Sequence, residues 1–415
     1  MFPFNQVLPL IIANIGRVFF NPIFWLVVFL VALQYRRMAA AKEAIYGIRL
    51  KQGWGDVFTA VVYGILGGLI GSVIMVVVGL TLSGTGLIYL WPVAIFLMLI
   101  NPRFLCFAYA GGIIALSNLI FNFPQINIPQ LLALVAILHL VESLLIFFSG
   151  HLGAIPAYFK AASGQLVGGF TLQRFWPIPI VALAVVGKTF LPEGINMPDW
   201  WPLIKPEIEG DPKNAVYTLI PVIAALGYGD LALARSPVKK SRLSAYFLGA
   251  YSLVLLIFAT LAQNFKELAL LAALFSPLGH ELVIFIGKKI EFQASPIYVS
   301  SHEGVRVLDT LKNTPAWQAG IRSHDLVLKV NGLPVFDRTS LEDSLNSKGK
   351  QEPIEVEYLH GETRNYRRKT CPPLQKEGQP FGLLLVPGPE ERSYLELNSG
   401  GLLGRWWQKI KRRKP

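Results

Sequence analysis

The stretch that decides the fold of the C-terminal part reads Asn313-Thr-Pro-Ala-Trp-Gln-Ala-Gly-Ile-Arg-Ser-His-Asp-Leu-Val-Leu-Lys-Val-Asn-Gly332. Pro315 to Gly320 has the length of one or two helical turns, and glycine readily takes the left-handed conformation that ends a helix. Leu326 to Val330 is a short apolar run typical of a strand. The Asn331-Gly332 pair after it favours a type I′ hairpin turn. These signals predict a small α/β unit.

The flanking residues add elements of the same size. We expect strands at Gly304 to Leu308 and at Pro380 to Val386, and an alternating, half-buried strand around Val356. Between them, Leu341 and Leu345 lie one helical turn apart in a segment that Thr339 or Ser340 could cap.

This order of elements resembles a circularly permuted bacterial PDZ domain over roughly residues 292 to 388. In such domains a glycine-containing loop turns backbone N–H groups toward the terminal carboxylate of a peptide, and the adjoining strand pairs with the peptide backbone. The resemblance assigns peptide binding to one loop and strand and to one face of a helix. The alternative is that these side chains only fill the core of a small sheet. The residues are Phe381, Gly382, Leu383, Leu384 and Leu385, with Leu341 and Leu345.

The N-terminal part has the composition of a membrane protein. The chain is 53% hydrophobic and only 15% charged, with a mean hydropathy of +0.47, which is more apolar surface than a soluble domain can bury. A spanning helix needs about 20 predominantly apolar residues, so we expect about nine spans. They are Pro22–Gln34, Val57–Leu82, Leu87–Ile100, Phe104–Phe121, Leu131–Gly150, Trp176–Leu191, Val216–Ala234, Leu243–Ala262 and Leu268–Ile286.

Apolar helical sequence gives way to short strand-like runs after Lys288-Lys289. We therefore divide the chain into a polytopic α-helical membrane domain (1–289), a small α/β PDZ domain (290–389) and a basic tail (390–415). Lysine and arginine gather in alternate loops, including the one at Lys239 and Lys240, and this asymmetry places the PDZ domain and the C-terminus in the cytoplasm.

Ionisable residues within apolar segments are costly, and they usually face a partner or a cavity. Five stand out: His139, Glu142, Asp230, His280 and Glu281. They indicate either metal or proton chemistry, or hydrogen bonds that fix helix packing, and we favour the second interpretation.

His280-Glu281 is similar to the start of the His-Glu-x-x-His motif of intramembrane metalloproteases. That motif works because two histidines one turn apart ligate zinc while the glutamate activates water. The position of the second histidine is occupied by Ile284, which cannot bind zinc. We therefore expect no catalytic residue, no metal, no cofactor and no enzyme activity, and we keep a protease or an inactive relative as the alternative.

The whole layout resembles the MinJ-like family of Gram-positive membrane proteins. Four segments carry the resemblance: Leu138-His-Leu-Val-Glu142-Ser-Leu-Leu, Gly227-Tyr-Gly-Asp230-Leu-Ala, Pro277-Leu-Gly-His-Glu281 and Gly304-Val-Arg-Val-Leu308. The resemblance implies a scaffold in cell division that links a DivIVA-like polar scaffold to a MinC/MinD-like inhibitor. Other peptides with a free terminal carboxylate remain alternative partners, and a homo-oligomer remains open.

The C-terminal tail combines two tryptophans with six basic residues. Such a segment binds anionic lipid at roughly 1 kcal/mol per charge near the surface, and we expect lipid rather than nucleic acid as its partner. The plain alternative is a solubilising tail. The residues are Arg405, Trp406, Trp407, Lys409, Lys411, Arg412, Arg413 and Lys414.

Three functions therefore compete: a membrane scaffold, an intramembrane protease and a transporter. No internal repeat or pair of broken helices supports the transporter. We expect a multi-pass protein of the cell membrane, enriched at the division site or the poles, that recruits proteins through its PDZ domain.

Overall fold

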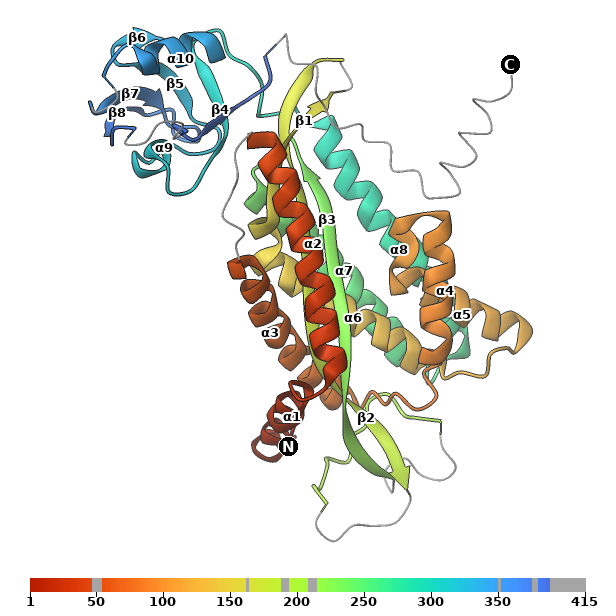
Figure 1. Ribbon diagram of the computed structural model, residues 1–415. Helices are drawn as coiled ribbons and strands as arrows, with labels where there is room; N and C mark the ends of the chain where they lie inside the picture. The colour runs from red at the N-terminus through yellow and green to blue at the C-terminus, as the bar shows by residue number, and fades with distance from the viewer. Residues whose placement is uncertain are drawn as a thin grey trace.

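The computed structural model describes residues 1–46, 54–161, 164–187, 194–207, 215–349, 352–374 and 380–388 (Figure 1). A small sheet domain lies at one end of a larger, mostly helical part, and the N-terminus lies toward the other end. The helices of the first part are α1 (Phe4–Val18), α2 (Pro22–Tyr46), α3 (Trp54–Val78), α4 (Leu87–Ile100), α5 (Phe107–Phe121), α6 (Ile128–Ser149), α7 (Pro237–Leu261) and α8 (Lys266–Gln293), with 3₁₀ turns η1 (Pro102–Leu105) and η2 (Gly150–Gly153).

Five helices in the described ranges are long and apolar enough to cross a membrane, namely α2, α3, α6 with η2, α7 and α8. The expected count of about nine spans is not met. Helices α4 and α5 have 14 and 15 residues, which at 1.5 Å per residue reach about 21–23 Å and fall short of a hydrocarbon core of about 30 Å.

Two of the expected spans, Trp176–Leu191 and Val216–Ala234, are wrong because the described residues of these segments lie mainly in strands. Strands β1 (Ala154–Lys160), β2 (Leu166–Gly187) and β3 (Val216–Ala232) make an antiparallel sheet in the order β1-β2-β3. The long strands run beside α2 (Figure 1). Hydropathy could not separate the two structures, because β2 is buried over most of its length and both strands are as continuously apolar as a spanning helix.

Helix α3 lies directly on the backbone of β2. A Cβ added at Gly64 would stand 2.0 Å from the carbonyl oxygen of Pro177, and one at Gly68 would stand 2.0 Å from that of Pro179. The glycines lie one turn apart and the prolines two residues apart, so the two repeats match along the contact. Both prolines lack an N–H group and leave no donor unsatisfied there.

The remaining backbone donors on this edge of β2 have partners, as an apolar environment demands. The N–H of Phe175 donates to the Tyr35 hydroxyl (3.3 Å) and that of Val181 to Ser72 Oγ (2.8 Å). Leu183 bonds with the segment after α3. A strand is therefore stable here because the helices supply what a further strand would supply.

Helices α4 and α5 form a hairpin, and a hydrogen bond joins the two chain segments that flank it. Residue Asn127, after α5, donates its backbone N–H to the carbonyl of Gly84, before α4 (2.8 Å). The turn η1, with Arg103, and then Cys106 form the tip of this hairpin. The tip contacts α8, because Arg103 forms an ion pair with Glu281 (2.9 Å).

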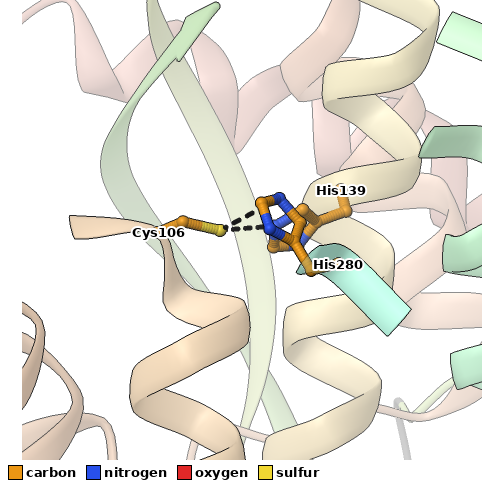
Figure 2. A group of neighbouring side chains, drawn as sticks. All are labelled: Cys106, His139 and His280. Carbon is orange, nitrogen blue, oxygen red and sulfur yellow. Dashed lines mark hydrogen bonds between the residues drawn. The ribbon is translucent and has the colours of Figure 1, made fainter. Parts of the chain in front are cut away.

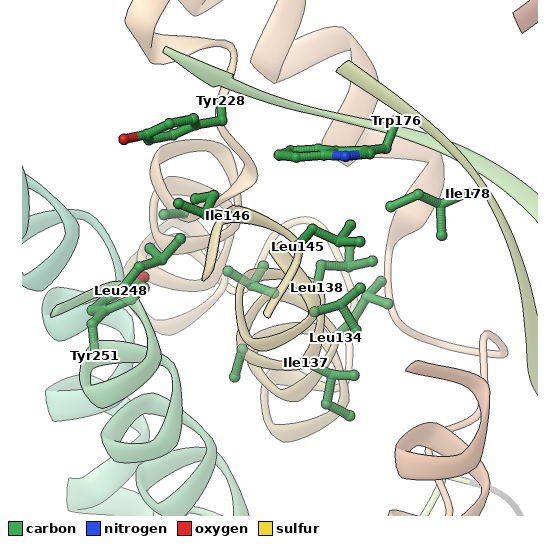
Figure 3. Close-up of a cluster of buried hydrophobic side chains, with 14 of the residues drawn as sticks. Leu134, Ile137, Leu138, Leu145, Ile146, Trp176, Ile178, Tyr228, Leu248 and Tyr251 are labelled. Atoms are coloured by element: carbon green, nitrogen blue, oxygen red, sulfur yellow. The ribbon is translucent and has the colours of Figure 1, made fainter. Parts of the chain in front are cut away.

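Helix α6 is the centre of the helical part, since most of its 22 residues are buried. Figure 3 shows Trp176 and Tyr228 from the strands on one side of α6, and Leu248 and Tyr251 from α7 on another. The Trp176 indole N–H donates to Ser149 Oγ (3.1 Å), so the strands and α6 share both apolar and polar contacts.

The second part is the expected α/β unit. It contains β4 (Val305–Thr310), α9 (Pro315–Gln318), β5 (Leu326–Val330), β6 (Leu333–Pro334), α10 (Arg338–Asn346), β7 (Ile354–Leu359), β8 (Tyr366–Cys371) and β9 (Leu383–Leu385). The sheet order is β8-β7-β5-β4-β9, with β6 paired to β5.

The local turn signals are confirmed. Gly320 has φ +82° after α9, and Asn331 and Gly332 have φ 52° and 80° between β5 and β6. The expected helix cap at Thr339 or Ser340 is wrong, because Asp337 is the N-cap and Ser340 completes a capping box with it. A serine side chain binds back to the cap as readily as it caps, and sequence spacing does not separate the two roles.

Candidate functional site

A groove of about 360 Å³ lies between α10 and the loop and strand at Phe381 to Leu385. Its lining includes every residue that the sequence assigned to peptide binding. Phe381 is only 7% exposed and also packs in the core of the sheet, so the groove and core interpretations overlap at this residue.

Gly382 gives this loop a backbone conformation that favours glycine. It has φ +94°, and an added Cβ would meet Thr314 Oγ1 at 2.1 Å. The carbonyl of Gly382 accepts from Leu311 and that of Phe381 from Ala316, whereas no described group accepts from the N–H groups of Phe381 and Gly382. Adjacent free N–H groups in such a loop are suited to binding a carboxylate.

Asn331 fixes the position of α10 through hydrogen bonds of its side chain. Its side-chain amide donates to the carbonyl of Ser344 (2.8 Å), and its amide oxygen accepts from the N–H of Glu355 (3.1 Å). The turn residue therefore connects helix α10 to strand β7. Arg338, at the first turn of α10, is exposed and lines the groove, which places a positive charge beside it.

The last turn of α2 forms another wall of the groove, through Ala44, Ile45 and Tyr46. Tyr46 donates its hydroxyl proton to the carboxylate of Asp309 on β4, and Lys42 lies 3.9 Å from the same carboxylate. Burial raises the pKa of Asp309, and Lys42 acts in the opposite direction. These contacts were not predicted, because hydropathy ends the span at Gln34 while the helix continues to Tyr46.

The intramembrane polar residues fall into separate groups. Asp230 accepts from Ser244 Oγ (2.6 Å) and forms an ion pair with Lys240 (3.1 Å), which connects β3 to α7. Glu142 is half-buried and makes no hydrogen bond or ion pair with any described residue. The packing role that we favoured from the sequence fits the geometry of Asp230.

His139 and His280 meet at Cys106 (Figure 2). The Cys106 sulfur lies 2.9 Å from His139 Nε2 and 3.5 Å from His280 Nε2. The three ligand atoms lie within 4.8 Å of one another, close enough to hold one metal ion. From the sequence, we considered His280 together with the adjacent Glu281. The sequence gave no signal for Cys106, because the cluster is formed by three segments that are far apart in the chain.

Glu281 points to other partners. Its carboxylate accepts from Tyr109 Oη (2.7 Å) and pairs with Arg103 (2.9 Å). A carboxylate held by two donors is poorly placed to take a proton from water. The geometry therefore gives no support to a metalloprotease in which Glu281 is the base.

The basic tail residues, Arg405 to Lys414, lie outside the described residues. Their lipid binding stays a prediction.

Comparison with known proteins agrees with this architecture. The PDZ domain family model matches residues 288–366. The cell division topological determinant MinJ of Bacillus subtilis is 23% identical over 401 residues, which cover 92% of this chain and 96% of MinJ. The chain is a MinJ-like protein with a PDZ domain. The similarity reaches through the helical part as well as the PDZ domain, so both belong to the shared architecture.

Two further similarities are confined to one region. A putative serine protease HhoA of Synechocystis is 31% identical over 70 residues, or 17% of this chain and 18% of that protein. The PDZ domain of an SdrC-like protein from Listeria monocytogenes is 22% identical, covering 21% of this chain and 92% of that one, with a TM-score of 0.18.

Proposed function

We propose that this MinJ-like protein is a non-enzymatic adaptor of the cell membrane that recruits division proteins through the groove of its PDZ domain. The observation that carries the proposal is the groove itself, lined by Gly382 and its neighbours on one side and by α10 on the other. The N–H groups of Phe381 and Gly382, from which no described residue accepts, and the charge of Arg338 suit a peptide that ends in a carboxylate.

The groove-lining strand β9 is the last strand of the described domain, which supports the circularly permuted order of a bacterial PDZ domain. The 1–289, 290–389 and 390–415 division follows the same plan, although helix α8 continues to Gln293. As partners we propose a DivIVA-like scaffold and a MinC/MinD-like inhibitor, because the relative that matches most of the chain is a cell division determinant.

We propose that the PDZ domain faces the cytoplasm. The ends of α2, α7 and α8 that lie toward the PDZ domain can be seen in Figure 1. Basic pairs lie in the half of each helix nearer that end, at Arg36-Arg37 on α2, Lys239-Lys240 on α7 and Lys288-Lys289 on α8. Cytoplasmic ends of spanning helices are enriched in such residues. The basic tail would then meet the anionic leaflet on the same side.

Site-specific photocrosslinking in living cells tests the proposal. A photoreactive phenylalanine analogue replaces Leu345, which lines the groove, or Phe336, which is 58% exposed in the same domain but does not line it. We expect cell-division proteins to be crosslinked from position 345 and not from 336. If both positions yield the same proteins, or 345 yields none, the groove is not the recruiting site.

A further inference from the structure

The cluster of Cys106, His139 and His280 joins three separate segments. Cys106 stands at the tip of the α4–α5 hairpin, His139 in the middle of α6 and His280 in the middle of α8. His139 is 3% exposed, and the other two are partly buried. Figure 2 shows both imidazole rings turned toward the sulfur.

The hydrogen bond of the other ring nitrogen fixes the tautomer of His139. Its Nδ1 lies 2.7 Å from the carbonyl oxygen of Val135, one turn earlier on α6. A carbonyl oxygen only accepts, so Nδ1 carries the proton and donates it. In a neutral imidazole Nε2 then has a free lone pair, and this lone pair points at Cys106.

His280 is held in the same tautomer, with the proton on Nδ1, by a chain of two hydrogen bonds. Its Nδ1 lies 3.4 Å from Tyr109 Oη, whose own proton is donated to the Glu281 carboxylate. The tyrosine oxygen can therefore only accept from His280. This leaves the lone pair of His280 Nε2 also directed at the sulfur.

Two lone pairs and one sulfur thus converge on one place. A thiol has a single proton and can satisfy only one of the two imidazoles. A metal ion satisfies all three groups at once, because the thiolate and both nitrogens donate electron pairs to it. Histidine ligands of metals commonly donate their second N–H group to a carboxylate, a backbone carbonyl or water. His139 donates to a backbone carbonyl, and His280 donates to a tyrosine that is itself held by a carboxylate.

We propose that Cys106, His139 and His280 bind a zinc ion, with a fourth coordination position left for water or a further ligand. Zinc accepts thiolate and imidazole ligands at about 2.3 Å and about 2.0–2.1 Å in tetrahedral geometry, which sets sulfur and nitrogen about 3.5 Å apart. The His280 separation matches this value, and the His139 separation of 2.9 Å needs only a small opening.

The bound ion ties the tip of the α4–α5 hairpin to α6 and α8. The hairpin falls short of a full span, and the ion adds to the apolar contacts of its tip and to the Arg103–Glu281 pair. The site stabilises the membrane part and does not depend on the function of the groove.

Metal content of the full-length protein tests the proposal. The protein is purified in detergent through a tag without histidine, loaded with Zn²⁺, dialysed, and measured by elemental mass spectrometry. We expect about one zinc per chain for the wild type and a loss of at least ten-fold for Cys106→Ser and His280→Gln. Cys371→Ser and His302→Gln are matched controls, since neither residue lies in the cluster, and both should keep the ion.

Cobalt gives a second readout that reports the ligand itself. Co²⁺ bound by a thiolate has a sulfur-to-metal charge-transfer band, which we expect in the wild type and in Cys371→Ser and not in Cys106→Ser. If Cys106→Ser fails to fold, stripping the wild type with a chelator and restoring the band with Co²⁺ keeps the test decisive. A wild-type protein that takes up neither ion, or a Cys106→Ser variant that binds both as the wild type does, overturns the proposal.

Discussion

At the scale of single residues, backbone conformation decides more of the candidate groove than side-chain chemistry does. Gly382 combines φ +94° with an approach to Thr314 that leaves no room for a Cβ. Gly332 has a similar φ of +80° but open space around it. Substitutions at the two glycines therefore distinguish the free energy lost to a strained φ from the free energy lost to a clash with Thr314.

Gly382→Ala should destabilise the β4–β9 pairing by about 2–4 kcal/mol, because it adds a steric clash to a strained φ. Gly332→Ala should cost about 1 kcal/mol, since it adds only the strain. Hydrogen–deuterium exchange of the PDZ segment in the full-length protein measures both. Equal exchange in the two variants would mean that the Thr314 contact is unimportant.

Cys371 provides a test of burial within the PDZ domain. Burial raises the pKa of its thiol to about 12, so at pH 8 only about one molecule in ten thousand carries the reactive thiolate. We expect it to resist iodoacetamide in the folded protein and to react after denaturation in urea, as read by peptide mass spectrometry. Rapid labelling without urea would contradict its placement in the core.

At the scale of elements, small residues on helix α3 allow it to pack directly on the backbone of strand β2. The glycines of α3 admit the carbonyls of β2, and Ser72 receives the N–H of Val181. In the absence of water, an unpaired backbone group costs several kcal/mol, so this pairing decides whether a strand can lie among spanning helices.

Gly68→Ala should lower the thermal stability of the detergent-purified protein by several degrees, because the new methyl group meets the Pro179 carbonyl at 2.0 Å. Gly55→Ala, in the same helix with nothing within 4 Å, should leave it unchanged or raise it slightly. A loss that is the same in both would mean that α3 does not pack on β2.

The end of α2 provides a second test at this scale. Tyr46→Phe keeps the ring that lines the groove and removes the hydrogen bond to Asp309. A hydrogen bond to a charged group contributes about 1.5 kcal/mol, which corresponds to about ten-fold in affinity. If peptide binding displaces this turn, a carboxylate-ended ligand should bind the full-length variant about ten-fold more tightly, as measured by fluorescence anisotropy. Unchanged affinity would mean that α2 does not compete with the ligand.

At the scale of the whole molecule, the sequence predicted turns and short helices, and it missed contacts between segments that are far apart in the chain. The turns at Gly320 and Asn331-Gly332 follow from the residues themselves, as does the helix bearing Leu341 and Leu345. The strands β2 and β3 did not follow, because their partner is a helix surface far away in the chain. The meeting of Cys106 with His139 and His280 depends on the same long-range packing.

The position of a fluorescent fusion of the full-length protein in its own cells tests the central claim most directly. The account predicts enrichment at division sites or poles that persists in Phe336→Asp and is lost in Arg338→Glu, whose exposed position makes loss of folding an unsuitable explanation. Equal membrane levels of the variants are checked by immunoblot. Enrichment that persists in Arg338→Glu and Phe381→Asp alike would contradict recruitment through the groove.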